Sequence, residues 1–586
     1  MAYSIGIDLG TTNSVLAFRE IEEASGVGVA AIPQLINANE VAAEPLLPSF
    51  LYMPGEKEFP AGATKLPWDS PDKYIVGRFA QRRGAEVSSR LVSSAKSWLS
   101  YSATDRTAAT LPWKAAEGVT RISPVDASAA YLRHLRIAWE HEHPDAPFAD
   151  QEVLVTIPAS FDAVARELTE KAAVSAGFKN VTLLEEPQAA FYAWIERHDD
   201  WRQRIGKGDL ILVIDIGGGT TDFTLISVSE REGQLQLDRV AVGDHILLGG
   251  DNIDLALAHT VASELAAKGT KVDAFQLQSL WNNCRLAKEK LLDPVSPASE
   301  VPVTILGKGS SLIGGTIKAT LRREQVEQVL EGFLPRAAST DLPQKPRVAG
   351  LQEMGLPYAS DAAITRHLAR FLHQGGERMA CPTHVLFNGG VLHAPFVRER
   401  LLSVLNGWLK EEGSPEIQAL TGEDLMHAVA RGAAYYGAAR HGKGVRIRGG
   451  IARSYYVGIE TAMPAVPGIA APVKALAVAQ FGMEEGSSAQ MPEREFGLIV
   501  GETAEFRFFS SSERKHDAPG TLIDDFGEEL EELSPVSVRL ESEATLAGAF
   551  VPVSFETVIT ETGMLQLWFV ARDGRRWKLE FNVREK

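Results

Sequence analysis

The sequence feature that most constrains the fold is a short motif that occurs twice. Residues 5–12 read IGIDLGTT, and residues 213–221 read VIDIGGGTT. In each copy, alternating apolar residues predict a strand, the glycine and threonine residues suit a tight turn, and the apolar residues that follow predict a second strand. We therefore expect two related lobes, each of which begins with a β-hairpin rather than with a strand-to-helix loop.

The chain around the two copies alternates strands with helices. Residues 153–158 (VLVTIP) predict a buried strand, and the helix that follows would begin at Asp162 and end at Gly177. The apolar stripe expected on this helix consists of Val164, Leu168 and Ala172. A second strand-to-helix unit is predicted at residues 383–387, with its turn at residues 388–390. This region is therefore expected to be mixed α/β.

In the last part of the chain the sequence changes to alternating strand patterns with few long helical ones. The clearest pair covers residues 565–570 and 577–581, joined as a β-hairpin by a turn at residues 573–574. We expect residues 1–445 to form one domain and residues 446–586 to form a β-rich second domain. A solvated loop without a function of its own is predicted for the acidic residues Asp524, Asp525, Glu528, Glu529, Glu531 and Glu532.

Composition narrows the class of protein. A chain of 586 residues is several times the size of one folding unit, and 45% apolar with 23% charged residues is typical of a globular protein in water. The formal net charge of −17 opposes binding to phosphate backbones, so no nucleic-acid partner is expected. The two cysteines, Cys284 and Cys381, are too few for a disulfide framework. Because we find no signal peptide and no membrane-spanning apolar run, we expect a cytoplasmic protein without a membrane partner.

Both hairpin turns are suited to binding phosphate. Small residues at 10–13 and at 217–221 allow backbone N–H groups to point at a phosphate group. An acid lies at the strand end beside each turn, Asp8 in one copy and Asp215 in the other, which suits Mg²⁺ held through water. A single glycine-rich hairpin is more often structural, but paired copies with matched acids favour a nucleotide clamped between two lobes.

Other phosphate-binding classes are excluded by their motifs. The sequence has no Gly-x-x-x-x-Gly-Lys-Ser/Thr stretch, which excludes a P-loop. Residues 525–527 spell the Asp-Phe-Gly tripeptide of protein kinases, but no His-Arg-Asp loop precedes them and they lie in the acidic loop. The tripeptide is therefore a chance match.

Together these motifs resemble the seventy-kilodalton heat-shock, or DnaK-type, chaperone family within the actin-like ATPase superfamily. Its two phosphate hairpins are similar to residues 5–14 and 215–222. Further resemblance lies in residues 155–161 with Arg166 (a proline switch and its relay arginine), 185–190 (a connecting segment), 387–395 (the adenosine loop) and 457–461 (the start of the substrate-binding β domain). The resemblance implies an α/β, actin-like (ribonuclease-H-like) two-lobed ATPase domain followed by a β-rich domain.

The resemblance also implies roles for individual residues. The catalytic set would be Lys96, Glu186, Thr220 and Asp222, and the metal would be held through water by Asp8 and Asp215. Lys96 would align the attacking water, and Thr220 would contact the γ-phosphate. Contacts to ATP or ADP would come from Gly10, Thr11, Thr12, Asn13, Gly217, Gly218, Gly219, Thr220, Gly249, Gly250, Asp251, Lys288, Gly389, Gly390 and His393.

Several features depart from the family pattern. His393 stands where the family has an arginine that helps to sandwich adenine, and its imidazole either stacks on the base or packs at a helix start. Residues 446–450 read RIRGG in place of the family's leucine-rich linker, so weak coupling between nucleotide and substrate is expected. The chain ends soon after its last predicted strand, and no helical lid is expected. Residues 105–124 and 336–374 have no clear family counterpart.

We interpret the sequence as a DnaK-type chaperone that hydrolyses ATP slowly with Mg²⁺. Its β-rich domain would bind unfolded polypeptide or a dedicated protein client, and a co-chaperone or nucleotide-exchange factor would be a further partner. Three alternatives stay open: a metabolite kinase of the same superfamily, a filament-forming actin-like protein, and a nucleotide-dependent scaffold without turnover. A kinase would need a base beside a hydroxyl-bearing substrate, a filament would pellet with ATP, and a scaffold would show no hydrolysis.

Overall fold

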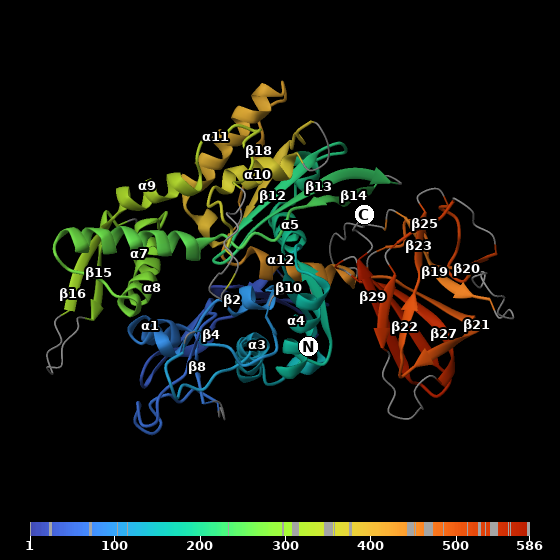
Figure 1. The fold of residues 1–586 in the computed structure, drawn as a ribbon, viewed down its shortest axis with the longest axis horizontal. Coiled ribbons are helices and arrows are strands. Elements are labelled where there is room, and N and C mark those ends of the chain that lie inside the picture. The colour runs from blue at the N-terminus through green and yellow to red at the C-terminus, as the bar shows by residue number, and fades with distance from the viewer. Residues whose placement is uncertain are drawn as a thin grey trace, which may run out of the picture. The chain divides into compact units, whose positions relative to one another are not determined.

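The fold is described from a computed structural model (Figure 1). It describes residues 2–22, 26–68, 73–101, 104–113, 115–231, 234–295, 298–306, 316–344, 356, 358–373, 378–422, 424–441, 451, 453–461, 473–484, 486–511, 514–524, 529–533, 535–539, 549–560, 562 and 564–582. The chain divides into two compact units. The first comprises Met1–Ser229 and Arg239–Arg446, and the second comprises Glu230–Asp238 and Ile447–Lys586.

The first lobe of the first unit is built on a sheet that opens with a hairpin. Strands β1 (Tyr3–Leu9) and β2 (Asn13–Glu20) pair antiparallel around the first copy of the repeated motif. β10 (Glu152–Ile157) lies parallel to β1, and β11 (Val181–Glu185) lies parallel to β10. The sheet order is β11-β10-β1-β2-β3, with β3 at Gly28–Val29, and β6 (Leu47–Pro48) pairs with β2.

The second lobe repeats this topology with the second copy of the motif. Strands β12 (Leu210–Ile216) and β13 (Thr221–Arg231) form the antiparallel hairpin, and β17 (His384–Asn388) lies parallel to β12. β18 (Gln418–Leu420) continues the sheet parallel to β17, which gives the order β14-β13-β12-β17-β18 with β14 at Gln234–Val242. Two related lobes, each opened by a hairpin, are therefore present as the sequence predicted.

Two helices at the junction of the lobes approach so closely that only glycine fits. Helix α5 (Glu186–Arg197) follows β11, α12 (Ala428–Arg440) comes after β18, and the two pack on each other (Figure 1). A Cβ atom on Gly432 of α12 would lie 1.7 Å from the carbonyl oxygen of Ala189 in α5. A Cβ atom on Gly6 of β1 would lie 2.2 Å from the carbonyl oxygen of Ala430. Backbone against backbone leaves no room for a side chain here.

Helix α4 (Ala163–Ser175) follows β10 and begins as predicted. The Asp162 carboxylate accepts a hydrogen bond from the Ala165 N–H at 2.7 Å, and Gly177 beyond the helix has φ +94°. The predicted apolar stripe is wrong at one end, because Val164 is 51% exposed. Its place in the core is taken by Ala165, one residue further on, which is buried together with Leu168 and Ala172.

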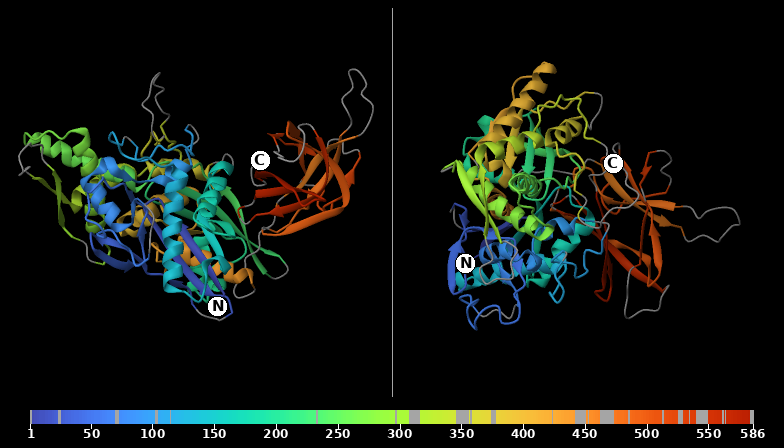
Figure 2. Two further views of the ribbon diagram at one scale, coloured as in Figure 1. Left: turned by 90° about the horizontal axis from the view of Figure 1, so that it is seen from below. Right: turned by 60° about the vertical axis from the view of Figure 1, so that its left-hand side comes forward.

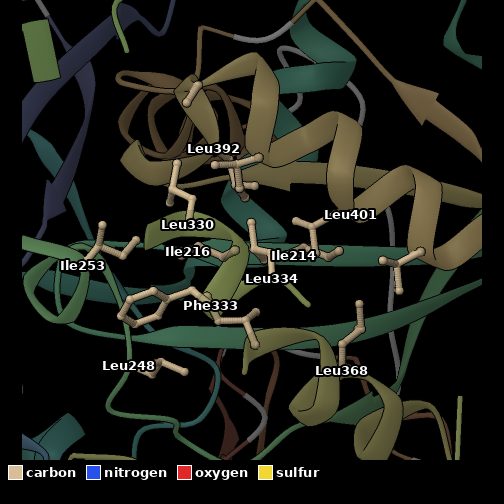
Figure 3. Close-up of a cluster of buried hydrophobic side chains, with 14 of the residues drawn as sticks. Ile214, Ile216, Leu248, Ile253, Leu330, Phe333, Leu334, Leu368, Leu392 and Leu401 are labelled. Atoms are coloured by element: carbon tan, nitrogen blue, oxygen red, sulfur yellow. The ribbon is translucent and has the colours of Figure 1, made fainter. Parts of the chain in front are cut away.

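The second lobe buries the β12 strand beneath three helices. Ile214 and Ile216 of β12 pack in one cluster with Phe333 of α9 (Arg323–Phe333), Leu368 of α10 (Ile364–Leu372) and Leu401 of α11 (Pro395–Glu411), as Figure 3 shows. These isoleucines alternate with Asp215, which points the other way because neighbouring strand residues face opposite sides of a sheet. The hydrophobic core therefore fixes the strand that carries the acid.

The remaining elements of the first unit complete the two lobes. They are β4 (Ile32–Asn37), β5 (Glu40–Glu44), β6 (Leu47–Pro48), β7 (Leu51–Tyr52), β8 (Ile75–Val76), α1 (Arg78–Glu86), η1 (Ser88–Arg90), β9 (Leu91–Val92), α2 (Ala95–Leu99), α3 (Pro124–Glu142), η2 (Phe148–Asp150), α6 (Trp201–Arg204), α7 (Gly250–Ala267), α8 (Ala274–Leu291), β15 (Glu300–Leu306), β16 (Thr316–Arg322) and η3 (Gly390–His393). Of the segments without a family counterpart, 105–124 packs through Trp113 on Trp98, and 336–374 includes α10.

The second unit is made of β-strands in two layers (Figure 2). One sheet has the order β24-β20-β19-β23-β25 and the other β21-β27-β28-β29, and Val457 and Leu476 of the first share a core with Phe555 and Leu567 of the second. The strands are β19 (Ser454–Glu460), β20 (Val473–Ala479), β21 (Ser488–Val500), β22 (Thr503–Phe506), β23 (Phe508–Ser511), β24 (Leu522–Ile523), β25 (Glu531–Glu532), β26 (Val536–Arg539), β27 (Ala549–Ile559), β28 (Met564–Ala571) and β29 (Arg576–Asn582). β28 and β29 form the predicted hairpin.

The acidic segment before the last strands differs from the predicted solvated loop. Glu531 and Glu532 form strand β25, which pairs with β23, and Glu532 forms an ion pair with Arg507 at 2.7 Å. Asp524 pairs with Lys474 at 2.6 Å. The described acidic side chains are exposed, as predicted, but Glu531 and Glu532 belong to a strand. The sequence did not indicate this strand because the residues that pair with it are not adjacent in the sequence. The tripeptide at 525–527, Glu528 and the linker residues 446–450 lie outside the described residues.

The part of the chain that the structure describes contains no helix that is both long and apolar enough to span a membrane.

Candidate functional site

A cavity of about 410 Å³ lies between the two lobes of the first unit. Most of the predicted site residues line it: Asp8, Gly10, Thr11, Thr12, Asn13, Lys96, Glu186, Asp215, Gly217, Gly218, Thr220, Gly250, Asp251, Lys288, Gly389, Gly390 and His393. Gly219, Asp222 and Gly249 are not part of its wall but lie directly behind it, as described below. Residues that were far apart in the sequence therefore meet at one place.

The two hairpin turns contact each other at this cavity. A Cβ atom on Gly218 would lie 1.9 Å from the Thr12 Oγ1 atom of the other turn, and one on Gly219 would lie 3.0 Å from the Thr11 side chain. Gly249 fits behind the second turn, since its Cβ atom would lie 2.7 Å from the carbonyl oxygen of Gly217. The glycines thus allow the turns to approach closely, and backbone N–H groups at such turns can bind phosphate.

The strand-end acids Asp8 and Asp215 both line the cavity. Thr156 Oγ1 donates to Asp8 Oδ1 at 3.4 Å, and Asn388 Nδ2 donates to Asp215 Oδ2 at 2.5 Å. Burial raises the pKa of Asp8 and raises that of Asp215 further, where the neighbouring carboxylates Glu186 and Asp222 add to the effect. Several carboxyl groups are therefore gathered in a space where an additional positive charge would be stabilised.

Lys96 and Glu186 form an ion pair in the wall of the cavity. Lys96 Nζ donates to Glu186 Oε1, and the two side chains are 10% and 13% exposed. Burial alone would lower the pKa of Lys96, but the carboxylates of Glu186 and Asp8 outweigh it and the net shift is upward. Burial raises the pKa of Glu186 to about 7, although Lys96 opposes that shift. Lys96 is therefore a fixed positive charge that faces the cavity.

The donor set fits a magnesium ion held through water. No group of three His, Cys, Asp or Glu side chains in the described ranges is arranged to bind one metal ion directly. Asp8 and Asp215 come from different lobes and face one cavity, which suits a hydrated ion better than a bare one. Asn388 Oδ1, beside Asp215, is buried and has no hydrogen-bond partner among the described residues. A bound water molecule would satisfy it.

Asp251 lies at the cavity, but both oxygens of its carboxylate already accept hydrogen bonds from protein side chains. It accepts from Arg285 Nη2 through Oδ1 and from Ser94 Oγ at 2.7 Å through Oδ2. Ser94 precedes helix α2, which carries Lys96, and has a left-handed backbone with φ 53°. A non-glycine residue in this conformation is held there by its surroundings. Asp251 therefore connects the second lobe to the start of the Lys96 helix.

Lys288 and His393 lie at the end of the cavity formed by α8, η3 and α11. Lys288 Nζ forms an ion pair with Asp254 Oδ1 at 2.7 Å. His393 is exposed and lines the cavity, so its side chain does not pack beneath the start of α11.

The sequence did not point to the rest of the cavity wall. These residues are Leu46, Arg78, Gln81, Ile253, Asp254, Arg285, Glu289, Leu292, Asp293, Leu330, Asn388, Val391, Ala394, Val397, Leu425, Met426 and Val429. Asn388, Val391 and Ala394 lie in the segment 387–395 that resembles the adenosine loop, so the sequence pointed to their region but not to their side chains. The others come from helices and loops whose orientation the sequence does not give.

The loop after β10 carries the residues that resemble a proline switch. Arg166 donates to the carbonyl oxygens of Phe161 at 2.9 Å and Ala159 at 3.1 Å, and it lies 3.5 Å from the buried Glu185. Arg239 of β14 donates to the other oxygen of Glu185. An arginine from each lobe thus meets one carboxylate next to Glu186.

Asp222 of β13 reaches the same loop. Its Oδ1 atom accepts from Ser160 Oγ and lies 3.4 Å from His245 Nδ1. Although burial raises the pKa of Asp222, His245 and the hydrogen bonds lower it, and the net shift is downward. Asp222 is therefore an ionised group that lies behind the cavity wall and binds the loop that carries Ser160.

Comparisons with known proteins identify similar chains. The family model described as Hsp70 protein matches residues 4–341. A chaperone protein HscA homolog of Bordetella pertussis is 30% identical over 346 residues, which cover 57% of this chain and 47% of that protein. Chaperone protein DnaK of Thermoplasma volcanium is 25% identical over 449 residues, covering 76% and 59%, and that of Mycoplasmopsis agalactiae is 26% identical over 432 residues, covering 73% and 59%. The chain thus matches about half of the length of these relatives.

Proposed function

This chain belongs to the Hsp70 family, and from that premise we propose that it binds and hydrolyses Mg-ATP in the cavity between its two lobes. Members of this family are ATPases with a two-lobed, actin-like domain. The observation that carries the proposal is that both hairpin turns, both strand-end acids and the Lys96–Glu186 pair meet at one cavity. Phosphoryl transfer to water requires such a set of positioned charges and backbone donors.

Each residue has a role that its position supports. Backbone N–H groups of residues 10–13 and 217–220 would bind the phosphates, and Thr220 would contact the terminal one. Asp8 and Asp215 would hold Mg²⁺ through water, and the ion would neutralise phosphate charge. Glu186 orients the Lys96 ammonium, which would align the attacking water.

The adenosine would lie toward Lys288, Gly389, Gly390 and His393, at the end of the cavity walled by Leu292, Leu330 and Val397. Apolar side chains with a few polar groups are typical of sites for a flat aromatic ring. Gly389 has φ +92°, and a Cβ atom at this position would lie 2.4 Å from the carbonyl oxygen of Ile216. Only glycine therefore allows the loop to pass so close to β12.

Calorimetry and phosphate release on the full chain test the ATPase proposal. We expect micromolar or tighter ATP binding that weakens when Mg²⁺ is chelated, and slow release of phosphate. Binding without release would identify a scaffold, and phosphate transfer to a small hydroxyl compound would identify a kinase. Absence of nucleotide binding would contradict the proposal.

We further propose that the β-rich second unit binds unfolded polypeptide or a dedicated client, as a DnaK-type chaperone. The relatives bear the name chaperone protein, and residues 457–460 form the end of β19 in that unit. Turnover measured with and without a permanently unfolded polypeptide tests this. Stimulation supports a chaperone, whereas sedimentation with ATP and no stimulation would indicate a filament.

The remaining proposals follow from the family and the composition. We propose a cytoplasmic protein with a co-chaperone or nucleotide-exchange factor, and with neither a nucleic-acid nor a membrane partner, since the net charge is −17. We keep 1–445 and 446–586 as the domains. Limited proteolysis should cut first in the arginine-containing segment between them.

A further inference from the structure

A chain of hydrogen bonds behind the cavity joins three segments around the proposed hydrolytic site. His245, in the segment between β14 and α7, is its centre. His245 Nδ1 lies 2.7 Å from Ser160 Oγ, and Nε2 lies 3.1 Å from Ser100 Oγ. Ser160 in turn donates to Asp222, and Ser100 ends helix α2, which carries Lys96. The imidazole therefore contacts the loop after β10, the Lys96 helix and the second hairpin.

The hydrogen-bond partners of His245 favour one form of the imidazole. Each serine hydroxyl has one proton to donate. That of Ser160 goes to the Asp222 carboxylate, and that of Ser100 goes to the Ser97 carbonyl oxygen at 2.8 Å. With the two protons placed in this way, each serine oxygen has a lone pair left to accept a hydrogen bond from the ring. A ring that donates from both nitrogens, which is an imidazolium, satisfies both contacts at once.

The surroundings contain the charges that such a cation requires. Asp222 of β13 lies 3.4 Å from Nδ1. Asp162, at the start of α4, has its pKa lowered first by the hydrogen bond from Arg106 and, less strongly, by the charge of His245. Asp244, next to His245 in the chain, is paired with Arg370 at 2.7 Å. The nearest carboxylate not matched by a guanidinium is thus Asp222.

The order of the groups excludes a serine-nucleophile triad. In such a triad the imidazole accepts the serine proton through one nitrogen while a carboxylate orients the other. Here the carboxylate accepts the Ser160 proton itself, and the second ring nitrogen contacts another serine. The ring joins segments rather than activating a nucleophile.

We propose that His245, as an imidazolium, is a positioning residue for ATP hydrolysis. It holds Asp222 and the end of the Lys96 helix in one arrangement, across the two lobes, so that the water-aligning lysine and the second phosphate turn keep their relative positions. This inference rests on the proposed ATPase function. It adds a residue that contacts neither nucleotide nor metal and acts through Ser100, Ser160 and Asp222.

Single-turnover hydrolysis and ATP affinity of the full chain test the proposal. His245→Ala should lower the hydrolysis rate by about tenfold or more, because charge-assisted hydrogen bonds to two segments are lost. The dissociation constant for Mg-ATP should stay within about threefold. His245→Gln, which can donate to one segment only, should recover part of the rate. His259→Ala, at an exposed histidine of α7 in the same lobe, is the matched control.

The split between rate and affinity separates positioning from mere packing. His245→Ala should lower the single-turnover rate while the dissociation constant for Mg-ATP stays nearly unchanged, and His245→Gln should restore part of the rate without a change in affinity. An unchanged rate in His245→Ala, or affinity that falls in parallel with the rate, would overturn the proposal.

A spectroscopic test does not depend on turnover. Long-range ¹H–¹⁵N spectra of histidine-labelled chain at pH 7, assigned by the signal lost in His245→Gln, should show both ring nitrogens protonated. A neutral ring would refute the imidazolium even if the chain hydrolyses ATP. A chain that shows the imidazolium without hydrolysis would contradict the ATPase proposal while preserving the network.

Discussion

At the scale of single residues, Lys96 has the most sharply defined task. Its ammonium is buried, paired with Glu186 and directed at the cavity. Because the side chain is already ordered, it can act on a water molecule without a further loss of conformational entropy. Lys96→Ala should leave Mg-ATP affinity within a few-fold and lower hydrolysis by about a hundredfold or more, because water alignment matters most in the transition state.

Phosphate release and calorimetry on Lys96→Ala measure the two effects separately. The matched control is Lys171→Ala, at an exposed lysine of α4 that does not line the cavity. If Lys96→Ala hydrolyses ATP at the wild-type rate, the assignment of Lys96 is wrong.

The strand-end acids give a second prediction at this scale. Asp8→Asn and Asp215→Asn should each weaken ATP binding in the presence of Mg²⁺ by about tenfold and leave binding after chelation nearly unchanged, because each removes one charge that would hold the hydrated ion. Calorimetry with and without Mg²⁺ checks this, with the exposed Asp145→Asn as control. An unaltered magnesium dependence in either variant would refute the clamp formed by both lobes.

At the scale of elements, the packing of α5 on α12 depends on a missing side chain. Gly432→Ala should destabilise the first unit by about 1–3 kcal/mol, because its Cβ atom would meet the backbone of Ala189 and force two helices apart. Gly407→Ala in α11 is the control, since nothing lies within 4 Å of its Cβ position and alanine is the better helix former.

Thermal unfolding of both glycine variants decides the matter. We expect the melting temperature to fall for Gly432→Ala and to stay or rise by a degree or two for Gly407→Ala. Equal stability of the two variants would mean that the helices can separate without cost.

At the scale of the whole molecule, the open question is how strongly the two units communicate. Nucleotide can change polypeptide affinity only through an element whose contacts differ between states. Residues 446–450 (RIRGG) offer a single apolar side chain, Ile447, between two arginines, which is little apolar surface with which to bind one state in preference to another. We therefore predict that ATP and ADP forms differ in affinity for an unfolded polypeptide by less than about fivefold, below the usual allosteric range.

Stopped-flow release of a labelled polypeptide in ATP and in ADP measures this ratio. Arg446→Leu combined with Arg448→Leu restores apolar character to the segment and should increase the ratio. Strong acceleration of release by ATP in the wild-type chain would show that these arginines couple the units by other contacts.

Much of this protein was determined by local sequence. The repeated Gly-Thr turns predicted the two hairpins and the two lobes. Each turn lies between alternating apolar runs and beside Asp8 or Asp215, so the strand pattern, the turn residues and the acid all indicate the same hairpin within a few residues. Asp162 predicted the start of α4 for the same local reason.

Features that depend on residues far away in the sequence were decided by the tertiary structure alone. Val164 lies outside the core because the rotation of α4 is set by what it packs on, and Glu531 and Glu532 form a strand because arginines and a neighbouring strand accept them. The hydrogen bond from Ser94 to Asp251 could not be predicted from the spacing of these residues in the sequence. The same holds for the contacts that His245 makes with Ser100, Ser160 and Asp222. Those side chains come from separate segments, and only the closing of two lobes on each other brings their hydrogen-bonding groups within reach.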